Sequence, residues 1–255
     1  MKDMYNCIEI AKKAGDAIMQ IYNKDLNIKY KDDNSPLTVA DLASHHIISL
    51  ELNRCYPYIP ILSEESFESF ILSDENLYFW CVDPLDGTKE FIKKNDEFTV
   101  NIALIENQKP VLGVIGVPAK NTIYAAVKDG GAFKKQGMNE LQPLKVKNQH
   151  PNKLTFAVSR SHLDSQTKDM VEEYQAEILK VGSSLKLAYV SEGLIDIYPR
   201  FGPTMLWDLA AGQCLIEEAG GKVLRIDNQQ PITYNINQMK NSSFIAVNET
   251  LKKKG

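Results

Sequence analysis

The stretch Asp83-Pro84-Leu85-Asp86-Gly87-Thr88 carries two carboxylates three residues apart on what is predicted to be a tight turn. It follows residues 77–82, whose aromatic and β-branched side chains predict a strand that ends before Pro84. Pro84 restricts the backbone, and Gly87 allows a ligand to approach the main chain closely. A helix is predicted over residues 89–94, and backbone N–H groups at a helix start bind phosphate oxygens. The turn therefore combines ligands for a cation with a binding site for an anion. The alternative, an acidic turn that only caps a helix, explains the paired aspartates but not the whole stretch.

Two further acids, Glu64 and Asp208, share this character. Glu64 follows a short apolar segment and Ser63, and Asp208 follows Trp207 at the start of a predicted helix. Asp41 stands at the start of another predicted helix. Each has a plain alternative when taken alone. Glu64 could be a surface acid, Asp208 an N-cap, and Asp41 an acid favoured by the helix dipole.

The chain outside these sites has the pattern of a mixed α/β protein. Apolar residues at steps of four and three predict a helix over residues 4–22, and a second helix is predicted from 38–41 to about 54. Strands at 98–105, 111–117 and 122–127 with short connections predict an antiparallel meander, followed by a hairpin turn at Gly130–Gly131.

The composition changes near residues 142–150, where polar residues predominate. Beyond them, strands at 154–158, 178–181, 194–198 and 244–247 alternate with helices at 165–174, 184–191 and 207–219. We therefore predict an N-terminal α+β subdomain over residues 1–145, with the helix pair and most of the acids. A C-terminal α/β subdomain is predicted over residues 146–255, with Asp208 and the residues that select the substrate.

Composition limits the possible partners. The 255 residues are 44% hydrophobic and 24% charged, with a net charge of −4, which argues against a dedicated nucleic-acid binder. No segment approaches the ~20 apolar residues of a membrane span, and residues 1–9 do not resemble a signal peptide. A cytoplasmic protein is expected, with weak peripheral membrane adhesion through Lys252–Lys254 at most. Cys7, Cys55, Cys81 and Cys214 are predicted to be buried, reduced thiols, and the oligomeric state is open.

Together, three blocks resemble the signatures of the inositol monophosphatase superfamily, whose members are Mg²⁺-dependent phosphomonoesterases, many of them inhibited by lithium. The blocks are Ser63-Glu64-Glu65, Asp83 to Thr88, and Trp207-Asp208-Leu209-Ala210-Ala211-Gly212. The resemblance implies the layered αβαβα sandwich of the sugar phosphatases. Trp80 and Trp207 are then expected in the core or in the site walls.

The resemblance also implies site residues. The ligands of two or three Mg²⁺ ions would be the side chains of Glu64, Asp83, Asp86 and Asp208 and the carbonyl of Leu85. Thr88 and Asp41 would orient and deprotonate the attacking water, with Glu64 also taking part in catalysis. The chemistry agrees, because clustered carboxylates raise one another's pKa and divalent cations relieve this. Oxygen ligands without histidine or thiolate favour Mg²⁺ over Zn²⁺.

The second half of the chain resembles the 3′(2′),5′-bisphosphate nucleotidases, and most closely their bacterial CysQ type. The resemblance is carried by Gly182-Ser183-Ser184-Leu185-Lys186, Ile197-Tyr198-Pro199-Arg200 and Gly202-Pro203-Thr204-Met205. It implies hydrolysis of adenosine 3′,5′-bisphosphate to AMP and phosphate, in sulfate assimilation.

A bisphosphate substrate needs cations for the phosphate that is not cleaved. Lys186 and Arg200 are expected to supply them, and Ser183, at a helix start, to donate a hydrogen bond. Gly87, Thr88 and Asp208 are also expected at the substrate. His162, within a loop at 159–162, could contact the base or the phosphate, or could be an ordinary loop histidine.

Two rival interpretations remain. An inositol or broad sugar-phosphate phosphatase could use the same scaffold, although Lys186 and Arg200 would then lack a second phosphate. A sensor that binds nucleotide or metal without turnover is disfavoured because every expected metal ligand and Thr88 are present.

Overall fold

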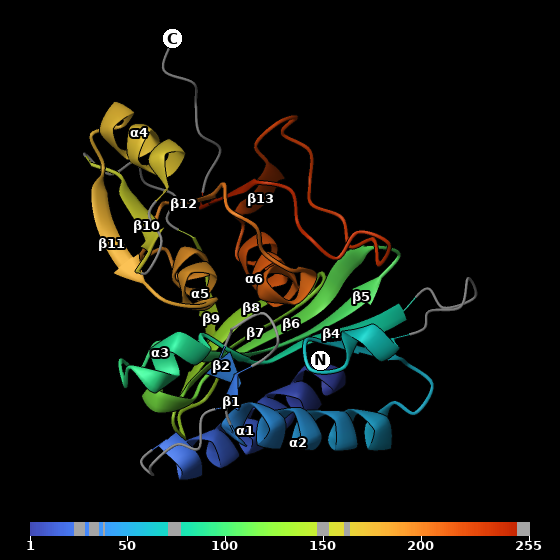
Figure 1. Ribbon diagram of the computed structural model, residues 1–255. Coiled ribbons are helices and arrows are strands. Elements are labelled where there is room, and N and C mark those ends of the chain that lie inside the picture. Colours follow the sequence, from blue (N-terminus) through green and yellow to red (C-terminus); the bar gives the residue numbers. More distant parts are fainter. Residues whose placement is uncertain are drawn as a thin grey trace.

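A computed structural model describes residues 1–22, 29–30, 36–37, 39–70, 78–146, 153–160 and 164–248. Helices and sheets alternate in layers (Figure 1). Helices α1 and α2 cover one face of a seven-stranded sheet, and α5 and α6 lie between it and a five-stranded sheet, whose outer face carries α4. The expected αβαβα order is confirmed. The helices are α1 (Lys2–Tyr22), α2 (Val39–Cys55), α3 (Thr88–Ile92), α4 (Ser165–Glu173), α5 (Leu185–Ser191) and α6 (Leu206–Glu218).

The first sheet is the predicted meander, extended at both ends. Its strands from β4 to β9 pair antiparallel in sequence order, and β3 adds to β4 in parallel. The strands are β3 (Ile61–Ser63), β4 (Tyr78–Asp86), β5 (Thr99–Glu106), β6 (Lys109–Val117), β7 (Thr122–Val127), β8 (Gly131–Gln136) and β9 (Gln142–Leu144). Short 3₁₀ helices lie at Phe67–Ser69 and Pro118–Lys120, and β1 (Lys29–Tyr30) pairs antiparallel with β2 (Pro36–Leu37).

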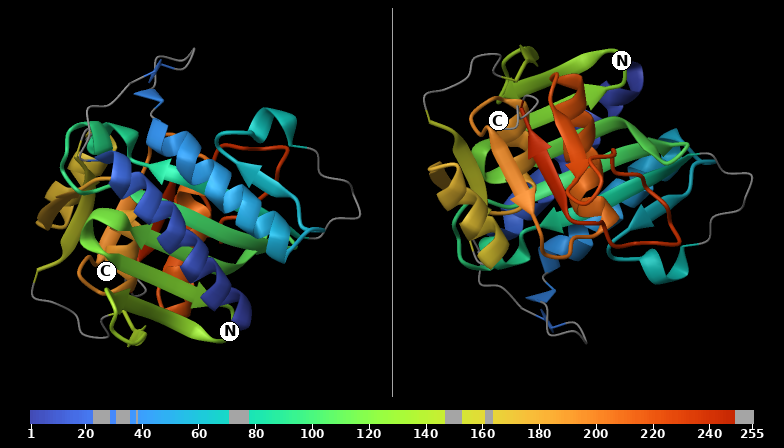
Figure 2. Two further views of the ribbon diagram at one scale, coloured as in Figure 1. Left: turned by 90° about the horizontal axis from the view of Figure 1, so that it is seen from below. Right: turned by 90° about the horizontal axis from the view of Figure 1, so that it is seen from above.

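The helix pair lies where the periodicity predicts. The predicted face of α1 is buried from Met4 to Tyr22, and α1 and α2 lie side by side across the sheet (Figure 2). Alternate residues of β4 face opposite layers: Trp80 belongs to the core cluster of α1 and α2, whereas Phe79 and Cys81 belong to the cluster that includes α6. Both sides of the first sheet are therefore core, which explains the apolar strands of the meander.

The second sheet has the order β11-β10-β12-β14-β13 and mixes parallel and antiparallel pairs. Its strands are β10 (Thr155–Ser159), β11 (Glu177–Val181), β12 (Ile197–Arg200), β13 (Lys222–Arg225) and β14 (Phe244–Val247). The strand predicted at 194–198 begins later, at Ile197. Helix α6 packs against both sheets and is buried almost all round, Trp207 included, as expected of a central helix.

The chain changes sheets between β9 and β10, but α6 packs on β5 and β6, so one core includes both halves. The division at residues 145 and 146 stays a prediction. Cys7, Cys81 and Cys214 are buried as predicted, whereas the prediction for Cys55 is wrong, because it ends α2 at the surface. Among the described residues, no helix is both long and apolar enough to cross a membrane.

Candidate active site

The acidic stretch begins inside a strand and not after it. The predicted end of the strand at Val82 is wrong, since β4 continues through Pro84 to Asp86. Asp83 faces Asn101 of β5 and Asp86 faces Thr99, so β4 holds one extra residue between them, which is a β-bulge. Pro84, which has no N–H, is tolerated at such an irregularity. The bulge turns the end of β4 without the separate tight turn that the sequence predicts.

The bulge is held by local hydrogen bonds. The Leu85 N–H donates to Asp83 Oδ1 at 3.1 Å, and the Ser44 hydroxyl of α2 donates to the Pro84 carbonyl at 2.7 Å. Gly87 follows with φ +88°, a left-handed conformation that favours glycine. Thr88 begins α3, which ends at Ile92 and is shorter than predicted, and its hydroxyl donates to the Leu85 carbonyl at 3.3 Å.

The fold gathers the five predicted acids from four elements. Asp41 is buried in the first turn of α2, and Glu64 follows β3, where its N–H donates to the Val82 carbonyl at 3.1 Å. Burial raises the pKa of the Asp83 carboxyl well above its ordinary value, and four carboxylates raise it further: Glu64, Asp86, Asp208 and Asp41. Burial likewise raises the pKa of Asp208, with Asp86 the next cause. Like charges are therefore confined together, as sequence reasoning predicts.

The donor chemistry fits a hard divalent cation. Among the described residues, no lysine or arginine forms an ion pair with Asp83, Asp86 or Asp208. In that same part of the chain, no three Asp, Glu, His or Cys side chains are arranged to hold one ion as they stand. Asp86 Oδ2 accepts from Ser184 and Asp208 Oδ2 from the Met205 N–H, so each carboxylate uses one oxygen within the protein. The carboxylates carry unneutralised charge that a cation would relieve.

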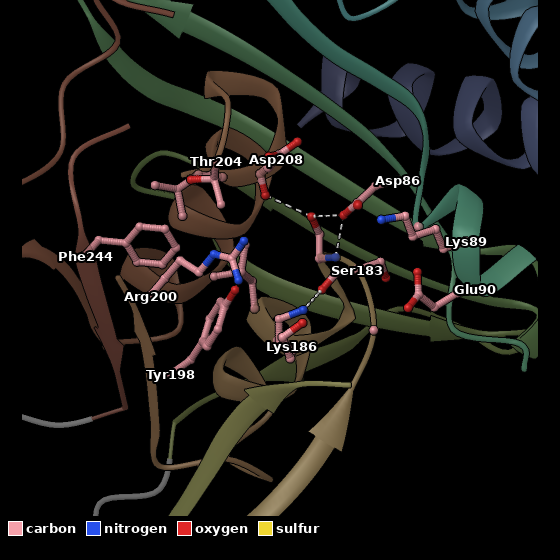
Figure 3. A pocket seen from close by; sticks show the side chains of 16 residues that line it. Asp86, Lys89, Glu90, Ser183, Lys186, Tyr198, Arg200, Thr204, Asp208 and Phe244 are labelled. Atoms are coloured by element: carbon pink, nitrogen blue, oxygen red, sulfur yellow. Dashed lines mark hydrogen bonds between the residues drawn. The ribbon is translucent and has the colours of Figure 1, made fainter. Parts of the chain in front are cut away.

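One pocket contains two of these acids, Asp86 and Asp208, together with predicted substrate residues, whereas Asp41, Glu64 and Asp83 do not line it (Figure 3). In this view Asp86 and Asp208 lie above Ser183, Lys186 and Tyr198 lie below it, Arg200 lies to the left, and Lys89 extends toward Asp86. Six predicted site residues line it: Asp86, Gly87, Ser183, Lys186, Arg200 and Asp208. The sequence assigned these residues to one site, and the fold brings them together. His162 lies outside the described residues.

The two cations of the pocket are held differently. Lys186 is buried, and its Nζ donates to the Ser183 carbonyl at 2.6 Å and lies 5.2 Å from the centre of the Tyr198 ring. Burial lowers its pKa to about 8, although the negative charge of Asp86 opposes this shift. Arg200 donates from Nη2 to the Pro203 carbonyl at 3.2 Å, while its buried Nε–H has no partner in the described chain. A buried donor without a partner in a pocket wall suits an anionic ligand.

Ser184 is the residue directly before α5, and the hydroxyl oxygen of the preceding Ser183 accepts from the Leu185 N–H at 3.3 Å, so Ser183 lies at the helix start as predicted. Ser183 adopts a left-handed conformation with φ +45°. Serine is a favoured N-cap residue, but this preference does not distinguish Ser183 from its neighbour Ser184. Lys89 and Glu90 also line the pocket, and sequence reasoning did not include them.

Sequence reasoning also missed that Glu97 holds the loop before α5 at Gly182. Glu97 accepts from Arg160 through both of its oxygens, at 2.8 and 2.5 Å, and from the Gly182 N–H at 2.8 Å. Arg160 belongs to the loop predicted at 159–162, and its guanidinium is paired with Glu97. No sequence signal connects residues this far apart in the chain.

Comparison with known proteins gives close relatives. The model of the inositol monophosphatase family matches residues 1–254. A 3′(2′),5′-bisphosphate nucleotidase CysQ of Shigella flexneri is 44% identical over 219 residues, which are 84% of this chain and 87% of that protein. A nucleotidase of the same name from Haemophilus influenzae is 35% identical over 245 residues, or 94% of this chain and 90% of that protein.

Solved structures agree with the sequence relatives. The crystal structure of CysQ from Bacteroides thetaiotaomicron, a bacterial member of the inositol monophosphatase family, matches with a TM-score of 0.84 at 36% identity, covering 98% of both chains. The family model, the relatives and the layered fold with its acidic bulge all lead to one assignment: this chain belongs to the inositol monophosphatase family.

Proposed function

We propose that this protein is a Mg²⁺-dependent 3′(2′),5′-bisphosphate nucleotidase that hydrolyses adenosine 3′,5′-bisphosphate to AMP and phosphate, as part of sulfate assimilation. The observation that carries the proposal is that one pocket holds both acids and cations. Asp86 and Asp208 line it together with Lys186 and with Arg200, whose buried Nε–H has no partner in the described chain. A substrate with one phosphate for a cation held by the acids and a second phosphate for Lys186 and Arg200 matches this combination. The names of the 44% and 35% identical relatives support the same activity.

The cation would be held by oxygen ligands alone. The side chains of Glu64, Asp83, Asp86 and Asp208 and the carbonyl of Leu85 are the proposed ligands, and this donor set suits Mg²⁺. When bound, Mg²⁺ supplies neutralisation of the phosphate charge and a water with a lowered pKa.

The residues of the chain supply orientation and proton transfer. Thr88 and Asp41 are proposed to orient the attacking water, with Asp41 accepting its proton and Glu64 assisting. The water oxygen then bonds to phosphorus while the bond to the 3′-oxygen breaks, and that oxygen takes a proton from solvent water to become the ribose hydroxyl. Gly87, which has no side chain, leaves room for the phosphate beside the backbone. Arg200, Lys186 and Ser183 would hold the 5′-phosphate, and His162 is a further proposed contact.

Three substrates test the proposal with purified protein and Mg²⁺: adenosine 3′,5′-bisphosphate, adenosine 3′-monophosphate and inositol 1-phosphate. The two nucleotides share the scissile bond and differ only in the second phosphate. Hydrogen bonds to charged groups contribute about 1.5–3 kcal/mol, so kcat/KM should favour the bisphosphate by about 10- to 150-fold. Equal rates on the two nucleotides would contradict the role of Lys186 and Arg200, and a preference for inositol 1-phosphate would favour the rival phosphatase.

A further inference from the structure

Ser184 stands at the junction of four elements. Its backbone N–H and its hydroxyl both lie 2.6 Å from the same oxygen of Asp86, Oδ2. The hydroxyl oxygen is also 2.8 Å from the Asp208 carbonyl and 2.9 Å from Asn101 Nδ2. One buried side chain thus contacts the end of β4, the interior of β5 and the first turn of α6 from the start of α5.

The donor and acceptor inventory assigns these contacts. A serine hydroxyl has one hydrogen to donate, and the Asn101 amide group can only donate to it. The hydrogen goes to the Asp86 carboxylate, because the acceptor is charged and the distance is short. Burial strengthens such a bond, because few water molecules compete for it. Asp86 Oδ2 is therefore saturated by two donors, which leaves Oδ1 for another ligand.

The loop that carries Ser184 has anchors of its own. Glu97 accepts from the Gly182 N–H at 2.8 Å, and Lys186 Nζ donates to the Ser183 carbonyl at 2.6 Å. The backbone N–H of Ser184 would also hold Asp86 in a variant without the hydroxyl. The hydroxyl is therefore not needed to keep the loop in place, and its remaining effect is on the orientation of the Asp86 carboxylate.

We propose that Ser184 is a positioning residue, whose hydroxyl fixes the rotation of the Asp86 carboxylate and so presents Oδ1 to a divalent cation. The inference rests on the proposed function, in which Asp86 is a cation ligand. Partners that orient metal ligands typically change cation affinity or activity by about 10- to 100-fold when they are removed. Ser184→Ala is expected to change cation affinity by a factor in this range, while the KM for the nucleotide at saturating Mg²⁺ changes little.

The test measures cation binding directly. Titration of the purified protein with Mn²⁺, followed by electron paramagnetic resonance, gives an affinity that does not depend on turnover. Ser191→Ala is the matched control, because Ser191 is buried in the same helix and its hydroxyl donates to the Ala188 carbonyl at 2.7 Å. Ser184→Ala should weaken Mn²⁺ binding about 10- to 100-fold, and Ser191→Ala should leave it unchanged. Thermal unfolding in EDTA checks that both variants fold, and Ser184→Cys, similar in size but a weak donor, should behave like Ser184→Ala.

A double-mutant cycle separates positioning from general loosening. In an Asp86→Asn background, removal of the Ser184 hydroxyl should cause no further loss of Mn²⁺ affinity, because the effect acts through the carboxylate. Wild-type Mn²⁺ affinity in folded Ser184→Ala would overturn the inference while leaving the proposed function intact. A wild-type protein that binds no Mn²⁺ or releases no phosphate would overturn the proposed function itself.

Discussion

The ammonium group of Lys186 donates a hydrogen bond of 2.6 Å to the backbone carbonyl of Ser183. Both residues are proposed substrate contacts, and this bond makes one depend on the other. Lys186 holds Ser183 in its left-handed conformation, φ +45°, and also faces the pocket. A change at Lys186 should therefore affect both the charge of the pocket and the shape of its loop.

Replacement of Lys186 by methionine keeps most of the length of the side chain and removes its charge. We expect kcat/KM for adenosine 3′,5′-bisphosphate to fall about 10- to 150-fold, on the scale of hydrogen bonds to charged groups. The loss should be smaller for adenosine 3′-monophosphate, which has no second phosphate. Lys12→Met is the control, because Lys12 is exposed on α1 and does not line this pocket. Equal losses on both nucleotides would assign Lys186 to the loop alone.

The pKa of Lys186 predicts a pH dependence. Its folded-state pKa of about 8 lies below the ordinary value of 10.5, because burial disfavours the charged form. Above pH ~8 the folded protein loses this charge, so the KM for the bisphosphate should rise between pH ~7 and ~9. In Lys186→Met this rise should disappear.

The lowered pKa of Lys186 has the opposite effect on stability: substrate binding should weaken as the pH rises, whereas the free energy of unfolding should increase. Between the two pKa values the unfolded chain holds more protons at this site than the folded chain does. The Lys186 contribution to the free energy of unfolding should therefore increase with pH in that window. Urea unfolding of the wild type and Lys186→Met at matched pH values measures the difference.

Replacement of Asp83 by asparagine should stabilise the protein in EDTA and abolish activity. The raised pKa of Asp83 means that its contribution to stability is present below pH ~4 and is lost as the pH rises through the folded-state pKa. At neutral pH asparagine removes a repelled charge and retains an oxygen that can accept from the Leu85 N–H. We expect the Tm in EDTA to rise by about 2–4 °C, which corresponds to about 1 kcal/mol for a chain of this length. Asp16→Asn, on the exposed face of α1, should do neither. A lower Tm for Asp83→Asn would contradict the repulsion.

Two glycines of β6 give a matched test of the contact between the first sheet and α6. A Cβ at Gly113 would lie 2.5 Å from the Ala211 carbonyl oxygen, whereas a Cβ at Gly116 would have its nearest neighbours at 3.7 Å. Gly113→Ala should therefore lower the free energy of unfolding by about 1–3 kcal/mol, as overpacking does. Gly116→Ala should leave it unchanged or raise it by up to about 1 kcal/mol. Denaturant unfolding measures both variants, and equal effects would exclude close packing as the cause.

Much of the fold could be predicted from short-range pattern. The apolar face of α1 and the strands of the meander follow from periodicities that span a few residues, and each forms where it was expected. The course of β4 through Pro84 could not be predicted, because proline ends a strand unless a bulge accommodates it. The short strand β13 was missed because its pairing partner, β14, begins at Phe244, far along the chain.

The sequence by itself predicted the chemistry of the site. The acids Glu64, Asp83, Asp86 and Asp208 indicate a hard cation, and the resemblance of their blocks to the family signatures implies a phosphate ester. Only the tertiary structure decided how these groups are held. Asp86 is bonded twice by Ser184, 98 positions away, and Glu97 holds Gly182, 85 positions away. Local sequence preferences reflect the interactions of a residue with its chain neighbours, whereas such distant hydrogen bonds exist only after the two sheets and α6 have packed together.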